Sequence, residues 1–236
     1  MKARLFGLLL FLMDNKAAHL LQVTRSKFIE NADASLAFGM SKYMKFKFSF
    51  FGIKKPLRAA LQKEIIKETG KPDFETIKEF ALMAWEEPER EFQYFAIDLM
   101  IGIRKKLQRN DLKLIKHLIE NKSWWDSVDN IAVNLAGQYF KQFPNNFELN
   151  KWIKSSNFWF QRSAIIHQLT YKKDTNEQML FEFCSLLKAE KEFFIRKAIG
   201  WALRQYARIA PFHVFNFVKN NEISPLSKRE ALKNAI

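Results

Sequence analysis

The sequence is poor in residues on which several classes of protein depend. Its single cysteine, Cys184, excludes an internal disulfide framework and fits a reducing compartment. Glycine (7) and proline (6) are scarce in 236 residues, whereas an all-β chain of this length needs many turn residues. We therefore expect an all-α protein in which Cys184, within an apolar helical run, is a buried structural thiol.

Signals for metal and cofactor chemistry are also missing. The four histidines (His19, His117, His167 and His213) are scattered, without the close His or Cys partners that a zinc site requires. Neither the dinucleotide-binding nor the P-loop glycine motif occurs in the chain. We expect no metal and no cofactor.

Acidic residues are few relative to basic ones. The chain has 39 Lys and Arg against 25 Asp and Glu, a net charge of +14, which favours a polyanionic partner such as nucleic acid or an anionic membrane surface. A basic surface that serves only solubility is the alternative. Residues 42–71 carry nine Lys or Arg against two Glu, so this segment alone contributes +7.

This basic segment begins with YMKFKFSFFGIKKP, in which cations and aromatic residues alternate. Such a pattern is typical of a loop that binds a phosphate backbone. We expect most of its phenylalanines to be in the core. Tyr43 is the aromatic candidate for a DNA groove, and Lys45 and Lys47 are candidates for phosphate contacts.

The N-terminus contains an apolar run, Leu5 to Met13, preceded by Lys2 and Arg4. The run resembles a weak signal-peptide core, but no small-x-small cleavage pattern follows it. It is too short to span a bilayer. We interpret residues 1–17 as an N-terminal extension, either an extra helix or unstructured, residues 18–236 as one domain, and the protein as cytoplasmic, with no membrane partner.

Apolar spacing with helix start and stop signals predicts a succession of helices along the chain. Pro56, Pro88 and Pro211 are expected in first turns, and Gly70 is expected as a helix C-cap. The predicted helices span residues 17–29, 32–44, 56–69, 74–85, 88–107, 111–120, 124–142, 147–154, 158–171, 175–188, 192–208, 211–219 and 226–235.

An internal repeat of 34 residues is the strongest signal. Isoleucine recurs at this step, and so do large apolar residues twelve positions earlier; the two series are Ile97, Ile131, Ile165 and Ile199, and Trp85, Ile119, Ile153 and Leu187. Each two-helix unit then has an apolar face that only its neighbours can cover. The Trp, Leu-Gly, Tyr and Pro spacing of tetratricopeptide repeats is absent, so the pattern favours a HEAT-like helical-repeat solenoid.

Two of these helices have candidate functional residues on a second face, next to the apolar face that is expected in the core. From Ser123 onward the stripe Trp124, Val128, Ile131 and Leu135 is apolar, and we expect it to be buried. Trp125 and Asp129 then share a second face one turn apart. The alternative is that both tryptophans pack and Asp129 is merely solvated.

The helix that begins near Glu192 repeats the arrangement. Its core stripe is Ile195, Ile199, Ala202 and Tyr206, and its second stripe is Lys197, Trp201, Arg204 and Arg208. A tryptophan among three cations suits a surface that stacks on a sugar or base and neutralises phosphates. Because successive second helices of a solenoid line its concave side, we expect Asp129, Arg162 and Trp201 to converge there.

Several strings of the sequence, in order, resemble the AlkD family of bacterial DNA alkylation repair glycosylases. They are KYMK, FFGIKKPLR, PEREFQYFAIDLM, KSWWDSVD, NFWFQRSAI, KEFFIRKAIGWALRQYA and SPLSKREALK. The resemblance runs from about Ala18 to the C-terminus. The first seventeen residues differ from the usual start of the family.

The resemblance implies a HEAT-like solenoid whose concave face binds duplex DNA. It also implies hydrolysis of the N-glycosidic bond of cationic bases such as 3-methyladenine and 7-methylguanine, without base flipping. Asp129 matches the family's catalytic aspartate, Trp125 and Trp201 match its two tryptophans, and Arg162 matches an arginine expected on a phosphate. We expect a monomer, and from sequence alone we expect Asp129→Asn to fold normally.

Two other functions fit the same fold. One is a non-catalytic HEAT-like protein that recognises branched or distorted DNA, which would be expected to lack Asp129 or one of the two tryptophans. The other is a protein-binding scaffold, which leaves the cationic stripe around Trp201 unexplained.

Overall fold

The computed structural model describes residues 15–233, and throughout this range the regular secondary structure is helical. The prediction of an all-α, helical-repeat protein is confirmed. The only extended pairing recorded in the described range is an isolated bridge between Ser49 and Glu89. None of the described helices combines the length and apolar character needed to cross a bilayer. The apolar N-terminal run, interpreted as part of an extension that is either an extra helix or unstructured, lies outside the described residues.

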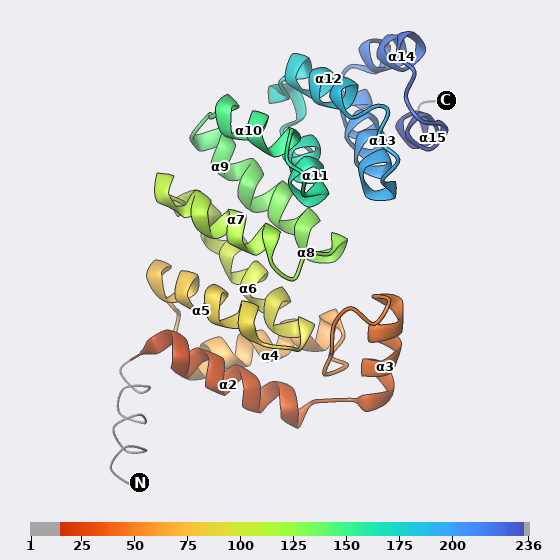
Figure 1. Ribbon diagram of the computed structural model, residues 1–236. Coiled ribbons are helices and arrows are strands. Elements are labelled where there is room, and N and C mark those ends of the chain that lie inside the picture. Colours follow the sequence, from red (N-terminus) through yellow and green to blue (C-terminus); the bar gives the residue numbers. More distant parts are fainter. Residues whose placement is uncertain (1–14, 234–236) are drawn as a thin grey trace, which may run out of the picture. The chain divides into compact units, whose positions relative to one another are not determined.

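The helices form two compact units, Met1–Lys106 and Leu107–Ile236 (Figure 1). The prediction of one domain over residues 18–236 concerns how these units act together, and it stays a prediction. In the first unit α2 packs against α4 and α5, and α5 packs against α6. Its helices are α2 (Lys16–Glu30), α3 (Ala34–Tyr43), α4 (Lys55–Thr69), α5 (Phe74–Glu86) and α6 (Arg90–Ile103), followed by a 3-10 turn, η1 (Arg104–Lys106).

Most helix boundaries of the first unit follow the predicted signals. Pro56 lies in the first turn of α4, and Gly70 caps this helix with a φ of 78°. The prediction for Pro88 is wrong, because α6 begins only at Arg90. The backbone N–H of Arg90 donates to the carbonyl of Ser49 at 2.9 Å, so the preceding residues pair with the basic segment instead of coiling.

A buried carboxylate fixes the end of the basic segment. Glu91 is fully buried at the start of α6 and accepts hydrogen bonds from the backbone N–H groups of Phe51, Gly52 and Ile53 at 3.0–3.1 Å. Gly52 has a φ of 89°, and a side chain there would collide with the backbone of Asp33. The FFGI string is therefore a rigid turn that α6 and α3 hold in place.

The second unit has more helices. They are η2 (Arg109–Asp111), α7 (Leu112–Glu120), α8 (Trp125–Asn130), the π-helical segment η3 (Ile131–Ala136), α9 (Gly137–Gln142), α10 (Asn146–Ile153), α11 (Phe158–Ile166), η4 (Lys172–Asp174), α12 (Glu177–Leu186), α13 (Phe193–Ala207), α14 (Pro211–Asn220) and α15 (Pro225–Leu232). α13 packs against α11, α14 and α15, and α11 packs against α10. Pro211 lies in the first turn of α14, as predicted.

The 34-residue repeat corresponds to buried positions in both units. The four isoleucines of the first series are at most 3% exposed, and the four residues of the second series are at most 6% exposed. Cys184 is fully buried, as predicted, and burial raises the pKa of its thiol. These positions form the apolar faces that neighbouring helices cover.

The predicted helix over residues 124–142 is not a regular α-helix. Its middle third is the π-helical segment η3, between α8 and α9. A wider turn leaves some carbonyls without their i+4 amide partners. Two side-chain amides beside this segment donate to backbone carbonyls of the preceding turn, Asn130 to Asp126 at 2.9 Å and Asn134 to Asn130 at 3.1 Å. Both asparagines belong to the face that carries Asp129.

Candidate active site around Asp129

Two adjoining hollows of the second unit share Trp125, Asp129 and Trp201. The first, of about 400 Å³, also includes Asn130 and Asn134 among the residues that line it. The second, of about 300 Å³, is lined by Trp125, Asp129, Arg162, Phe193, Phe194, Lys197, Trp201, Arg204 and Glu230. The structure thus brings together the four residues that the sequence singled out, Trp125, Asp129, Arg162 and Trp201.

Helix α8 places Trp125 and Asp129 one turn apart, so both side chains point to the hollows. Val128, Ile131 and Leu135 of the opposite stripe are fully buried. Trp124 is only partly buried and precedes α8 as its N-cap residue. Its ring packs edge-on against Trp159 and Phe194, at centroid distances of 5.9 and 5.2 Å, which anchors the start of the helix.

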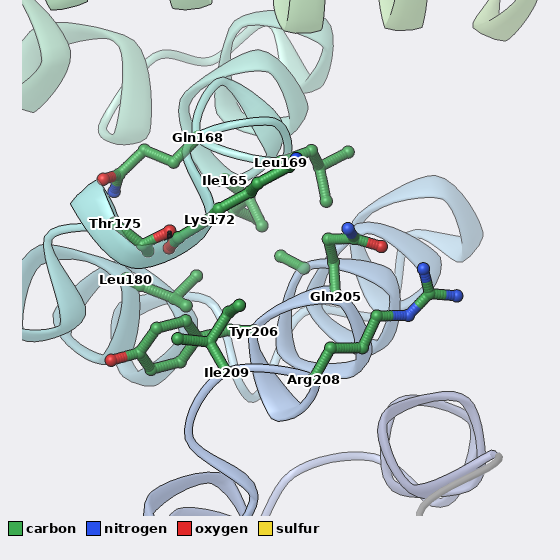
Figure 2. A pocket seen from close by; sticks show the side chains of 11 residues that line it. Ile165, Gln168, Leu169, Lys172, Thr175, Leu180, Gln205, Tyr206, Arg208 and Ile209 are labelled. Carbon is green, nitrogen blue, oxygen red and sulfur yellow. Dashed lines mark hydrogen bonds between the residues drawn. The ribbon is translucent and has the colours of Figure 1, made fainter.

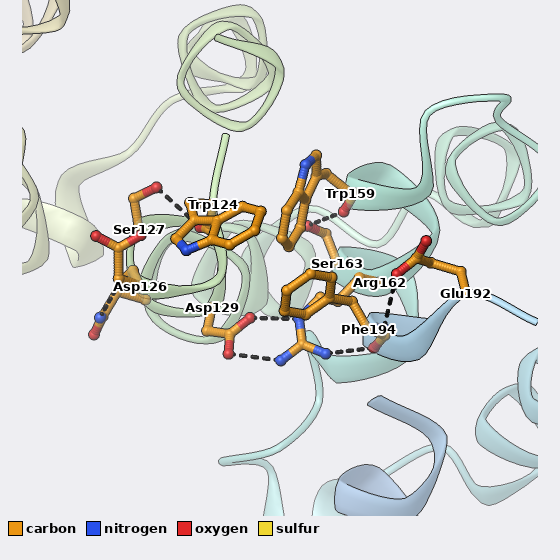
Figure 3. Close-up of polar contacts among 10 residues, drawn as sticks. Trp124, Asp126, Ser127, Asp129, Trp159, Arg162, Ser163, Glu192 and Phe194 are labelled. Atoms are coloured by element: carbon orange, nitrogen blue, oxygen red, sulfur yellow. Dashed lines mark hydrogen bonds and ion pairs between the residues drawn. The ribbon is translucent and has the colours of Figure 1, made fainter. Parts of the chain in front are cut away.

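Asp129 and Arg162 form a bidentate ion pair (Figure 3). The Nε of Arg162 donates to Oδ1 of Asp129 at 2.6 Å, and Nη2 donates to Oδ2 at 2.7 Å. The remaining nitrogen, Nη1, donates to the carbonyl of Phe194 at 2.5 Å. The side chains of Arg162 and Asp129 are 6% and 15% exposed, so water screens this pair weakly.

This geometry differs from the phosphate contact that the sequence implied for Arg162. All three nitrogens of the guanidinium are directed to Asp129 and Phe194, and the residue is buried. A planar guanidinium matches a carboxylate with two parallel hydrogen bonds, and it fixes the orientation of that carboxylate. Arg162 therefore positions Asp129 in this structure.

Burial raises the pKa of Asp129 above its ordinary value. The hydrogen bond and the charge of Arg162 act in the opposite direction, and the nearby charge of Asp126 adds to the rise. Asp129 is thus a carboxylate with few solvent contacts and a firm orientation. Such a group stabilises a cation placed next to it far better than a solvated carboxylate does.

Trp201 reaches the same hollows from α13. Two cations flank it on its own helix, Lys197 one turn before and Arg204 one turn after, and both line the smaller hollow. Arg208, the fourth member of the predicted stripe, is exposed and lines a neighbouring hollow instead. The core stripe of α13 is buried over Ile195, Ile199 and Ala202, whereas Tyr206 is partly exposed.

The two cations beside Trp201 have a carboxylate partner that the sequence analysis missed. Glu230 of α15 accepts from Lys197 at 3.0 Å and from Arg204 at 2.8 Å. Gly200 allows this approach, because a Cβ there would collide with the Cβ of Glu230 and lie 2.9 Å from the carbonyl of Ser227. A glycine on α13 was the one local signal that another helix lies close.

Phe193 and Phe194 are further site residues that the sequence analysis did not identify. Phe193 is 50% exposed and lines the smaller hollow, whereas the backbone carbonyl of Phe194 holds Arg162. Glu192 caps the start of α13 by accepting from the N–H of Phe194 at 3.1 Å (Figure 3). The KEFF string therefore fixes the backbone that holds Arg162.

A third hollow, of about 180 Å³, lies between the segments around Leu169 and Gln205 (Figure 2). It shares Leu169 and Gln205 with the larger of the two site hollows. Lys172 and Arg208 also line this hollow, and Lys172 has a positive φ of 55°. Leu169 and Gln205 thus border both hollows.

Three further predicted DNA contacts belong to the first unit. Tyr43 ends α3 and is 68% exposed, and Lys45 and Lys47 are exposed in the turn that follows. Lys45 and Phe46 have φ values of 58° and 55°. The expectation that most phenylalanines of this segment lie in the core is wrong: Phe50 is buried, Phe48 and Phe51 are partly buried, and Phe46 is 61% exposed. Their contribution to DNA binding stays a prediction.

No group of His, Cys, Asp and Glu within residues 15–233 has a metal-binding arrangement. His167 is buried between Phe140 and Tyr171, and burial lowers the pKa of its imidazole to about 4. It makes a 2.7 Å hydrogen bond with the carbonyl of Ala164. These features mark His167 as a neutral structural residue.

The sequence matches the family model described as "DNA alkylation repair enzyme" over residues 24–235, and the chain belongs to this family. A solved structure described as "Predicted DNA alkylation repair enzyme from Enterococcus faecalis" is similar to the chain, with 34% sequence identity and a TM-score of 0.77. The similarity covers 86% of this chain and 96% of the other. No curated protein matches the chain.

Proposed function

We propose that the protein is a DNA glycosylase of the AlkD type that removes cationic alkylated bases, such as 3-methyladenine and 7-methylguanine, from duplex DNA. The observation that carries this proposal is the oriented, poorly solvated carboxylate of Asp129 in hollows shared with Trp125 and Trp201. Membership in the alkylation repair family supports DNA as the substrate.

The residue types fit the chemistry of a base that is already positively charged. Such a base is a good leaving group, so the enzyme need not protonate it. As the glycosidic bond breaks, positive charge develops on the deoxyribose. Asp129 stabilises this charge and orients the water that attacks the sugar.

Trp125 and Trp201 contribute through their aromatic faces. Both line the two hollows beside Asp129, one from α8 and one from α13. Electron-rich ring faces against the sugar stabilise the developing cation by about 1–2 kcal/mol each. A lesion held this way stays against an open surface and is not flipped into a deep pocket.

In this proposal Arg162 acts through Asp129 and not through a phosphate. The guanidinium keeps the carboxylate ionised and fixed, which lowers the reorganisation needed as charge develops. We assign Tyr43 of the first unit to a groove of the DNA and Lys45 and Lys47 to phosphate contacts. Lys197 and Arg204, beside Trp201, belong to the DNA-binding surface of the second unit.

The decisive experiment measures free base released from duplex DNA that contains either 7-methylguanine or uracil. We expect release of 7-methylguanine and none of uracil, since uracil is neutral and the proposed mechanism does not protonate the base that leaves. Asp174→Asn is the matched control for loss of one carboxylate: Asp174 is exposed in a surface pair with Lys141, so activity should be retained. DNA binding without release of 7-methylguanine would favour the non-catalytic, structure-binding function.

A further inference from the structure

The C-terminal string SPLSKREALK has no role in the chemistry described above, yet it forms the helix that packs most closely on α13. Ser224 caps this helix, α15, by accepting from the N–H of Ser227 at 3.1 Å. The hydroxyl of Ser227 donates to the carbonyl of Arg196 at 2.9 Å, and Gly200 permits close backbone contact. These contacts hold α15 in place without Glu230.

The carboxylate of Glu230 pairs with the two cations that flank Trp201. One oxygen accepts from Lys197 and the other from Arg204, and its side chain is 14% exposed. The hydrogen bond from Lys197 lowers the pKa of this carboxyl, and the hydrogen bond from Arg204 acts in the same direction. The group is therefore ionised at neutral pH and competes for the two cations that flank Trp201.

The phosphates of bound DNA would form ion pairs with the same two cations. Lys197 and Arg204 are 37% and 25% exposed in their side chains, so they are accessible to a ligand on the site face. A phosphate gains their full charge only if it displaces the carboxylate of Glu230. Each phosphate that a protein neutralises steepens the salt dependence of binding by about 0.9 logarithmic units per decade of salt.

We propose that Glu230 is a positioning residue that withholds Lys197 and Arg204 from the phosphates of undamaged DNA. This proposal rests on the proposed function, because it assumes that the hollow around Trp201 faces DNA. Weak binding along undamaged duplex leaves the protein free to move on, whereas a cationic base is retained by the contacts of Asp129 and the tryptophans. The carboxylate thus limits residence on undamaged sites.

The test compares Glu230→Gln with wild type in binding to an undamaged duplex over a range of salt concentrations. We expect tighter binding of the variant at low salt and a slope steeper by about 0.9 to 1.8, for one or two cations that turn to phosphates. Glu222→Gln is the matched control, because it also removes one carboxylate, from an exposed position before α15. Its slope should equal that of wild type.

A purely structural role for Glu230 predicts the opposite result. Glu230→Gln would then melt at a lower temperature and bind DNA no more tightly, with the wild-type slope, and this outcome would overturn the proposal. Lys197→Gln adds a second measurement in the wild-type background, where the slope should fall by less than about 0.9 because Glu230 already holds that charge. A full fall of 0.9 would also overturn the proposal, even if Glu230→Gln does not fold.

These results separate the proposal from the function on which it rests. Absence of duplex binding by wild-type protein at low salt would contradict the proposed function itself. Wild-type binding with no difference between Glu230→Gln and Glu222→Gln would contradict only the assignment of Glu230. Both measurements use undamaged DNA and so need no glycosylase activity.

Discussion

Burial raises the pKa of Asp129, and two charged groups act on it in opposite directions, Arg162 downward and Asp126 upward. If the reaction needs the ionised carboxylate, activity falls as the pH drops through this pKa. Replacing Arg162 with Gln removes the influence that lowers the pKa. The acid limb of the pH–rate profile should therefore move to higher pH.

The size of the shift follows from the contacts that are lost. Arg162 makes two charge-assisted hydrogen bonds to Asp129, and neither side chain is more than 15% exposed. A hydrogen bond to a charged group is worth about 1.5–3 kcal/mol, and one pKa unit corresponds to about 1.4 kcal/mol. Loss of even one of these bonds should move the limb by at least about one pH unit, and activity should partly recover at higher pH.

The assay is single-turnover release of 7-methylguanine across a range of pH, with enzyme-free DNA at each pH to subtract spontaneous loss. Asp126→Asn is the opposing control: it removes a charge that raises the pKa of Asp129, so its acid limb should move to lower pH. Folding of both variants is followed by circular dichroism. An unchanged acid limb in folded Arg162→Gln, or shifts of the same sign in both variants, would refute the reasoning.

Two further predictions concern stability. Asp129→Asn should lose about 3 kcal/mol of unfolding free energy, because it leaves the buried Arg162 without its carboxylate. Its rate of base release should fall by about 10²- to 10³-fold. Wild-type stability of this variant in urea unfolding would contradict the first expectation and support the one made from sequence. Because His167 has a folded pKa of about 4, below its ordinary 6.5, its contribution to stability is complete above pH 6.5 and is lost as the pH falls toward 4. Between pH 6.5 and pH 4 the unfolding free energy of wild type should fall by roughly 3 kcal/mol more than that of His167→Phe. Equal falls in the two proteins would contradict a neutral, buried imidazole.

Periodicity in the sequence predicted the features that depend on a single helix. The 34-residue step identified eight positions that are all buried. The pairing of Trp125 with Asp129 was also predictable, because residues four apart on one helix share a face. The same reasoning placed Trp201 off the core stripe of α13. Family resemblance then assigned these residues to one site.

Contacts between helices could not be predicted in this way. Arg162 and Asp129 are 33 residues apart, and so are Lys197 and Glu230. Nothing in the local pattern of either helix shows which charge faces it from a neighbour. The π-helical segment after α8 was equally hidden, because it changes backbone hydrogen bonding without interrupting the apolar stripe.

With Glu230 included, the charges that line the site nearly balance, although the whole molecule is strongly basic. The smaller hollow is lined by three cations, Arg162, Lys197 and Arg204, against two carboxylates, Asp129 and Glu230, a net charge of +1. The whole chain carries +14, and residues 42–71 alone carry +7. Long-range attraction of DNA must therefore arise mostly outside the site. Under the proposed function, a nearly balanced site lets one oriented carboxylate act on a cation without being outweighed by surrounding positive charge.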